Sequence, residues 1–370
     1  MGFGLGLNLL LLMAMVATNI LSLYHLSSSQ QHRSPPPPPV PDHLLHQLST
    51  IRATINHLTR LRSTTTSSSN SAHPPPPIPP DLLLYTRLSP IASACRDHPD
   101  LLHRFMNYTP FSLCPSDHSL ADSLILRGCH PLPRRRCFSP TPPKPPSSLP
   151  TSPFPSSLPD SAVLWSPYSC KSFSCLARFN DNLGFDLKIE SARFVSSKSN
   201  LDLTIPQLLH IAKNSSSALR LALDVGGGTG TFAARMKLHN VTVVTTTMNL
   251  GAPYNEAVAL RGLIPLHMPL QQRFPVFDGV VDLVRCGHAV NRWIPTVAME
   301  FLLYDVDRVL RGGGFLWIDH FFCKGADLDK VYSPLIGRLG YKKLKWATGN
   351  KTDSKHGEVY LTALLQKPLK

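Results

Sequence analysis

The sequence predicts an α/β fold, with a doubly wound sheet of seven strands in the C-terminal part of the chain. From residue 219 onward, apolar strand-like segments alternate with helix-like segments, and the first of them runs into a glycine-rich loop. Upstream, 27 of the 36 prolines lie between residues 27 and 160. Because proline removes a backbone donor and fixes φ, one uniform globular fold is excluded. We therefore expect a proline-rich N-terminal part and a packed domain over residues 161–370.

The first 26 residues contain no Lys, Arg, Asp or Glu. A helix needs about 20 apolar residues to cross a bilayer, so this run predicts a transmembrane signal anchor. A cleaved signal peptide is the alternative, although its apolar region normally spans only about 7–15 residues after a basic start. We expect membrane attachment through residues 1–26.

Residues 27–80 form a stem rich in Pro and Ser, with a composition typical of an extended spacer. Within it, the apolar residues of segment 42–62 step by four and three, which is coiled-coil spacing. A coiled coil would join two chains as a homo- or heterodimer next to the membrane. A short surface helix is an equally good interpretation of so short a run.

The chain has eight cysteines, four of which lie in a proline-broken neck over residues 81–160. Their spacing does not match a zinc site, so we expect disulfides and no metal. Disulfides form in oxidising compartments and staple segments that have little core of their own. Four Asn-X-Ser/Thr triplets, which are glycosylation acceptors, also favour a lumenal location. The neck cysteines are Cys95, Cys114, Cys129 and Cys137, and Cys170 and Cys175 form a close pair further on.

The clearest chemical signal is LRLALDVGGGTG at residues 219–230. An apolar strand ends near Asp224, a loop with four glycines follows, and a helix-like segment begins after the loop. This arrangement suits a nucleotide-like ligand, because glycines let the backbone approach closely and a helix start presents free N–H groups. The dinucleotide fingerprint would require a third glycine where this chain has Thr231, so that ligand class fits less well.

The later segments continue the α/β order. We expect strands at 241–247, 263–267, 280–290 and 314–322, a helix at 296–309, and a closing antiparallel pair at 340–347 and 357–368.

With these motifs in order, residues 200–366 resemble a class I S-adenosylmethionine-dependent methyltransferase domain, which has a Rossmann-like fold. LALDVGGGTG resembles the first motif of that family, RFPVFDGVVDLVRCGHAV resembles the segment before and along its fourth strand, and DRVLRGGGFLWI resembles its RVLRPGG segment. Upstream, NYTPFSLC, RGCHP, RCFSP and the region of Trp165 are similar to the plant Golgi putative-methyltransferase family, in a shorter branch. Some members of that family are linked to pectin methylation. The resemblance implies a transferase in the Golgi membrane, single-pass and type II, with its catalytic domain in the lumen.

The resemblance also implies S-adenosylmethionine as cofactor. Two acids of the family pattern are missing, one at the end of the second strand, where Asn249 would replace it by hydrogen bonding, and one near the adenine. These departures leave open a non-catalytic scaffold that partners a catalytic relative. The expected cofactor-binding residues are Asp224, Val225, Gly226, Gly227, Gly228, Thr229, Gly230, Asn249, Leu270, Gln271 and Arg285.

Methyl transfer from a sulfonium is an in-line displacement, so the protein chiefly aligns the acceptor with the methyl group. A hydroxyl or amine acceptor needs a base, whereas a carboxylate is already ionised. His288 follows the fourth strand, and Asp319 and His320 follow the fifth, so we expect these three as catalytic residues.

Residues 161–370 carry 25 basic and 16 acidic side chains, a balance of +9. A basic surface attracts a polyanion, so we expect an acidic polysaccharide such as pectin as acceptor. A small molecule or a protein is the alternative acceptor. Nucleic acid is not expected, because the RRR run at 134–136 lies among prolines and cysteines.

Overall fold

The structure is a computed structural model that describes residues 18, 21, 93–144, 148, 150–179, 183–351 and 357–369. The predicted stem and the coiled coil at 42–62 lie outside the described residues, as does the predicted anchor except for Thr18 and Leu21. Within the described ranges, no helix combines the length and the apolar character that a membrane span requires. Anchor, stem and coiled coil therefore stay predictions.

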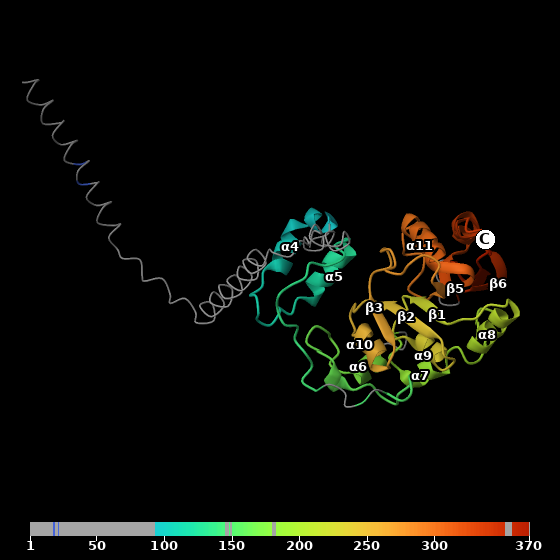
Figure 1. Cartoon of the computed structure of the whole chain (residues 1–370), viewed down its shortest axis with the longest axis horizontal. Coiled ribbons are helices and arrows are strands. Elements are labelled where there is room, and N and C mark those ends of the chain that lie inside the picture. The colour runs from blue at the N-terminus through green and yellow to red at the C-terminus, as the bar shows by residue number, and fades with distance from the viewer. Residues whose placement is uncertain are drawn as a thin grey trace, which may run out of the picture. The chain divides into compact units, whose positions relative to one another are not determined.

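A seven-stranded sheet forms the centre of the C-terminal region, in the order β3-β2-β1-β4-β5-β7-β6 (Figure 1). Neighbouring strands from β3 to β5 are parallel, and β7 is antiparallel to both β5 and β6. This confirms the predicted α/β sheet with its closing antiparallel pair. The strands are β1 (Leu221–Val225), β2 (Thr242–Thr247), β3 (Ile264–His267), β4 (Val281–Cys286), β5 (Leu310–Lys324), β6 (Lys342–Asn350) and β7 (Glu358–Gln366).

Two strand predictions differ from the structure in length. The fourth strand was predicted over 280–290, but β4 ends at Cys286 because the next residues form a turn in which the Val290 N–H donates to the Gly287 carbonyl over 2.9 Å. The fifth was predicted over 314–322, but β5 runs from Leu310 to Lys324 because β7 pairs along it as far as Lys324. The end of β5 is therefore fixed by pairing with a distant segment, which a local pattern does not contain, whereas the end of β4 is fixed by a local turn.

Helices cover both faces of the sheet (Figure 1). Alternate residues of β1 point to opposite sides: Ala222 packs into the cluster of α8 and α9, whereas Leu223 and Val225 pack into that of α11 and α13. The helical elements are η1 (Ser93–Asp97), α4 (Pro99–Met106), α5 (His118–Leu126), η2 (Asp160–Ala162), α6 (Phe173–Phe179), α7 (Leu187–Ala192), α8 (Ile205–Asn214), α9 (Thr231–Lys237), α10 (Tyr254–Leu260), α11 (Thr296–Val309), α12 (Gly325–Asp327), η4 (Leu328–Tyr332) and α13 (Ser333–Gly337).

The start of α8 shows how local sequence sets an element. The side chain of Thr204 accepts from the Gln207 N–H, and the side chain of Gln207 accepts from the Thr204 N–H. This capping box satisfies two backbone donors that a helix start leaves unpaired, and Pro206 fits the first turn because it has no N–H to lose.

Residues 150–179 form a small core of their own against α10. Leu158, Val163, Phe173 and Leu176 are buried together with Ala257 of α10. The predicted division between neck and methyltransferase domain at residue 160 stays a prediction, but contacts cross it.

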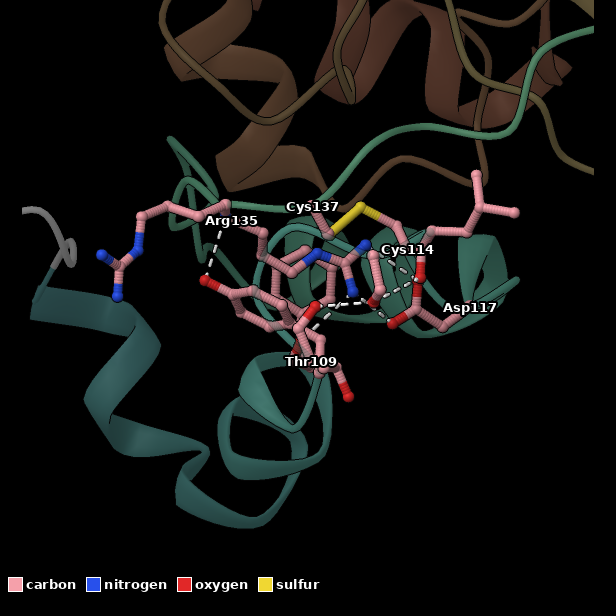
Figure 2. The surroundings of a disulfide bond; sticks show 10 residues. Thr109, Cys114, Asp117, Arg135 and Cys137 are labelled. Carbon is pink, nitrogen blue, oxygen red and sulfur yellow. Dashed lines mark hydrogen bonds and ion pairs between the residues drawn. A yellow bond between two sulfur atoms is a disulfide. The ribbon is translucent and has the colours of Figure 1, made fainter. Parts of the chain in front are cut away.

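The neck over residues 93–138 is held by two disulfides. Cys95 pairs with Cys129 and Cys114 with Cys137, which confirms the expected disulfides of this segment, and Cys170 pairs with Cys175. Beside the second bridge, Arg135 donates to both carboxylate oxygens of Asp117 over 2.7 and 3.0 Å (Figure 2). The small core of the neck therefore depends on covalent and ionic links.

Replacing Cys95 and Cys129 together by Ser should destabilise the neck by about 3 to 4 kcal/mol, because the loop that their disulfide closes spans 34 residues. The measurement is denaturant unfolding of the full-length chain under oxidising conditions, followed by proteolysis at neck residues. Under reducing conditions the variant and the wild-type chain should unfold alike. Equal stability of the two chains in oxidising buffer would contradict the prediction.

Candidate functional site

The loop between β1 and α9 is held against the end of β2. The Gly226 N–H donates to Oγ1 of Thr246 over 2.9 Å, and the Gly227 N–H donates to the Thr246 carbonyl over 3.1 Å. A Cβ on Gly226 would lie 2.4 Å from the Cβ of Ala289, so no side chain fits there. At Gly228, by contrast, nothing lies within 4 Å of the Cβ position. The loop therefore packs tightly against the sheet at Gly226, whereas the space next to Gly228 is free.

A cavity of about 550 Å³ lies over this loop, where β1, β2 and β4 end. The strand order reverses between β1 and β4, and ligands of open α/β sheets bind in the crevice at such a point. The volume lies within the usual range for small-molecule sites. The predicted residues that line the cavity are Gly226, Gly227, Gly228, Thr229, Leu270, Gln271, Arg285 and His288.

The other predicted residues lie elsewhere. Val225 is fully buried in the core below the loop, and Gly230 is the N-cap of α9 in the left-handed conformation. Asn249 does not line the cavity, because its amide donates to Glu256 and accepts from Asn255. Asn249 is thus engaged by the first turn of α10, and its contact with the ribose stays a prediction.

Asp224, Arg285 and Asp319 form a buried network, which His320 extends toward the surface. Nη1 of Arg285 donates to Oδ1 of Asp224 over 2.7 Å, and its Nη2 donates to Oδ2 of Asp319 over 2.6 Å. Nδ1 of His320 lies 2.7 Å from the other oxygen of Asp319. Arg285 also lies over the ring of Phe194 at 4.9 Å. The network links the strand below the glycine loop to β5.

Pairing and burial compete in setting the pKa values of this network. Burial opposes ionisation of Asp319, but Arg285 and His320 outweigh it and hold the pKa of Asp319 well below its usual range. Burial would lower the pKa of Arg285, but the two carboxylates raise it. At Asp224 burial prevails over Arg285, so its pKa is raised. The firmly charged pair is therefore Arg285 with Asp319.

His288 is an exposed titratable side chain that lines the cavity. Desolvation, together with the charges of His320 and Arg193, lowers its pKa. The imidazole is therefore neutral at neutral pH, with one nitrogen that donates and one that accepts.

Sequence analysis missed the part of the wall that comes from before β1. Glu190 of α7 is buried and accepts from Arg193 over 3.1 Å, and both line the cavity. Thr229 fixes this segment on the glycine loop, because its Oγ1 donates to the Gly184 carbonyl over 2.9 Å. Asp186, which caps α7, is a signal for a helix here. That signal does not say that the helix meets the glycine loop.

Arg261 was missed as well. It is fully buried, and it donates to the carbonyls of Pro153 and Thr229, each over 2.8 Å. The ring of Phe154 lies between Arg261 and Arg235, 5.0 and 4.5 Å from their guanidinium carbons. Burial lowers the pKa of Arg261 to about 10, so it stays charged at neutral pH. Residues 153 and 154, in the predicted neck, therefore help to support the glycine loop.

Comparison with known proteins agrees with this geometry. A family model described as "Putative S-adenosyl-L-methionine-dependent methyltransferase" matches residues 193–324. The Arabidopsis thaliana protein "Probable methyltransferase At1g29790" is 65% identical over 383 residues, which cover 100% of this chain and 99% of the relative. The chain belongs to this methyltransferase family. It is a methyltransferase that uses S-adenosylmethionine.

Solved structures with similarity to this methyltransferase include the N-methyltransferase NodS from Bradyrhizobium japonicum in complex with S-adenosyl-l-homocysteine. It is 13% identical, with a TM-score of 0.33, over 49% of this chain and 98% of that one. A second is 1,6-didemethyltoxoflavin-N1-methyltransferase from Burkholderia thailandensis, with 15% identity and a TM-score of 0.35 over 53% of this chain and 87% of that one.

The residues of the cavity fit the cofactor. Oδ2 of Asp224 is buried, has no hydrogen-bond partner within the described part of the chain, and lies 2.1 Å from where a Cβ on Gly227 would be. An unsatisfied carboxylate oxygen directly beneath the loop favours a positively charged ligand group, such as the cofactor's ammonium. The loop backbone at Gly228 and the side chains of Leu270 and Gln271 would hold the rest.

Replacing Gly227 by Ala should weaken S-adenosylmethionine binding about ten- to hundredfold, because the new Cβ would collide with Asp224 and Thr245. The measurement is calorimetric titration of the full-length chain. Gly312→Ala is the matched control, since its Cβ would meet nothing closer than 3.6 Å. Equal affinities of the two variants would contradict the prediction.

Replacing Arg285 by Met should destabilise the fold by about 3 to 5 kcal/mol at neutral pH, because two buried carboxylates lose their partner. Without the guanidinium, burial raises the pKa of both carboxyls, so they protonate as the pH falls and the penalty disappears. The difference in free energy of unfolding between wild-type and variant chains should therefore grow as the pH rises from about 4 to 7. Urea unfolding across this range measures it. A difference that does not change with pH would contradict the stated role of the network.

Proposed function

We propose that this methyltransferase forms methyl esters on carboxylates of an acidic cell-wall polysaccharide such as pectin, and that it does so in the Golgi lumen as a single-pass type II membrane protein. Family membership gives the methyl donor. The acceptor, the membrane anchor and the compartment are our inference.

The proposal of a carboxylate acceptor rests on the charged side chains in the wall of the cofactor cavity. Among the described residues that line it, Glu190 is the only carboxylate, and Arg193 pairs with it. The described part of the wall therefore holds no free carboxylate base, and neutral His288 is the side chain left that could deprotonate a hydroxyl or amine acceptor. Arg193 is about half exposed and can orient an anion. An acceptor that arrives already ionised suits this wall.

The chemistry that follows is simple. S-adenosylmethionine supplies an electrophilic methyl group on a sulfonium. Arg193 and the N–H of neutral His288 would orient the acceptor carboxylate, one oxygen of which forms the new C–O bond as the C–S bond breaks. No proton moves, so alignment by these side chains is the main contribution of the protein.

Two observations support the compartment. Three disulfides join six of the eight cysteines, and such bonds persist in oxidising compartments. The uncharged run at residues 1–26 has the length of a membrane span. The balance of +9 over residues 161–370 bears on the acceptor instead, because a basic surface attracts a polyanion.

The test is methyl transfer by the full-length chain from methyl-labelled S-adenosylmethionine to de-esterified polygalacturonate. We expect label that mild alkali releases as methanol, which identifies an ester. Asp224→Asn should reduce transfer at least about a hundredfold, because it replaces the buried carboxyl group beneath the glycine loop that the cofactor's ammonium would contact. Asp278→Asn, at a side chain that is 68% exposed, is the matched control and should not change transfer.

Label that alkali does not release would mean a hydroxyl or amine acceptor and would overturn the ester proposal. Transfer only to small uronic acids, or only to protein, would replace the polysaccharide by those acceptors.

A further inference from the structure

A second cavity, of about 440 Å³, lies beside the cofactor cavity. Its wall comes from the segment between α7 and α8 on one side and from β5 on the other, and Arg193 lines both cavities. The two spaces therefore share a wall at Arg193. The function described so far makes no use of the second one.

The two carboxylates in the wall of the second cavity already have hydrogen-bond partners within the protein. Asp319 accepts from Arg285 and is paired with His320. Oδ2 of Asp202 accepts from the backbone N–H groups of Lys198 and Ser199 over 2.7 and 2.8 Å. Neither carboxylate is therefore placed to attract a cationic ligand.

The cationic side chains in the same wall are less engaged. Arg193 pairs with Glu190 through Nη1 only, and its side chain is 53% exposed. Within the described ranges, Nζ of Lys198 makes no hydrogen bond or ion pair. Two cations with donors to spare favour an anionic ligand.

His320 is held toward this cavity by unusual backbone geometry. Its φ is 53°, in the left-handed region that non-glycine residues seldom occupy, and it lies at the register shift between β5 and β7. Its N–H donates to Oγ1 of Thr362 over 3.2 Å. Because the carboxylate of Asp319 is ionised, Nδ1 carries the proton that it shares with Asp319. Bulges of this kind redirect side chains near functional sites.

We propose that the second cavity is the acceptor subsite, and that it binds the carboxylate of a uronate unit next to the one that is methylated. Lys198 binds that carboxylate, whereas Arg193, which lines both cavities, orients the one that reacts. Nε2 of His320, which lies 3.6 Å from Oδ1 of Asp202, contacts a hydroxyl of the same unit as Lys198. The apolar side chains of Ile189 and Leu203 line the rest of the cavity and suit the face of a sugar ring. This inference rests on the proposed function, since it assumes a polyuronate acceptor.

The first test compares Lys198→Gln with the wild-type chain, using trigalacturonate as acceptor. KM for trigalacturonate should rise about five- to twentyfold, because one charged hydrogen bond is lost, whereas kcat and the affinity for S-adenosylmethionine stay within about twofold. KM for monomeric galacturonate, which needs no neighbouring unit, should not change. Higher ionic strength should reduce the difference between variant and wild type.

Lys188→Gln is the matched control, because Lys188 is an exposed lysine of α7 that lines neither cavity. His320→Gln should also raise KM for trigalacturonate. An equal KM for the Lys198 and Lys188 variants, or an effect of Lys198→Gln confined to kcat, would overturn the subsite.

A binding measurement with trigalacturonate tests the proposed subsite separately from the proposed function. If the wild-type chain methylates no uronate, the proposed function fails. Calorimetric titration of trigalacturonate into the full-length chain with S-adenosylhomocysteine still tests the cavity: binding that Lys198→Gln weakens and Lys188→Gln does not supports the subsite. No binding to the wild-type chain, or binding that both variants leave unchanged, overturns it.

Discussion

The rest of the site depends on the buried ion pairs that the guanidinium of Arg285 forms with two carboxylates. The guanidinium pairs with Asp224 below the glycine loop and with Asp319 in β5, and all three groups are almost fully buried. Removing the guanidinium would leave two carboxylates unpaired in the interior, which costs more than the pairing contributes. The position of the loop, the ionisation of Asp319 and the orientation of His320 follow from this arrangement.

Segments before β1 complete the site. Arg261 and Phe154 connect a proline-rich stretch to the glycine loop, and Arg193 of the segment after α7 closes the cavity wall. Further upstream, Asp122 of the neck lies 3.1 Å from Nε2 of His267 at the end of β3. The chain N-terminal to the methyltransferase motifs is thus part of the architecture of the cavity, beyond any role as a tether.

The sequence predicted those helices and strands well whose positions depend only on a local pattern of apolar and turn residues. Strands β1 to β3, helix α11 and the antiparallel pair of β6 and β7 lie where the sequence places them, because alternation of apolar residues and turn residues is visible over short windows. The extension of β5 to Lys324 was not predicted, because it depends on pairing with β7. The end of β4 at Cys286 was not predicted either, because the turn from Gly287 to Val290 interrupts an otherwise apolar run. For the site, the glycine loop was predicted, whereas Glu190 and Arg193 were not.

By itself the sequence determined the α/β class, the glycine loop after Asp224 and the cofactor class, because a short motif carries each of them. Only the tertiary structure decided which side chains meet that loop. Asn249 is occupied by its own neighbours, whereas Arg193 and Arg261 reach the site from segments far away in the chain. The reason is physical: hydrogen-bond partners and buried charge pairs are chosen by packing across the sheet, which no window of the sequence contains.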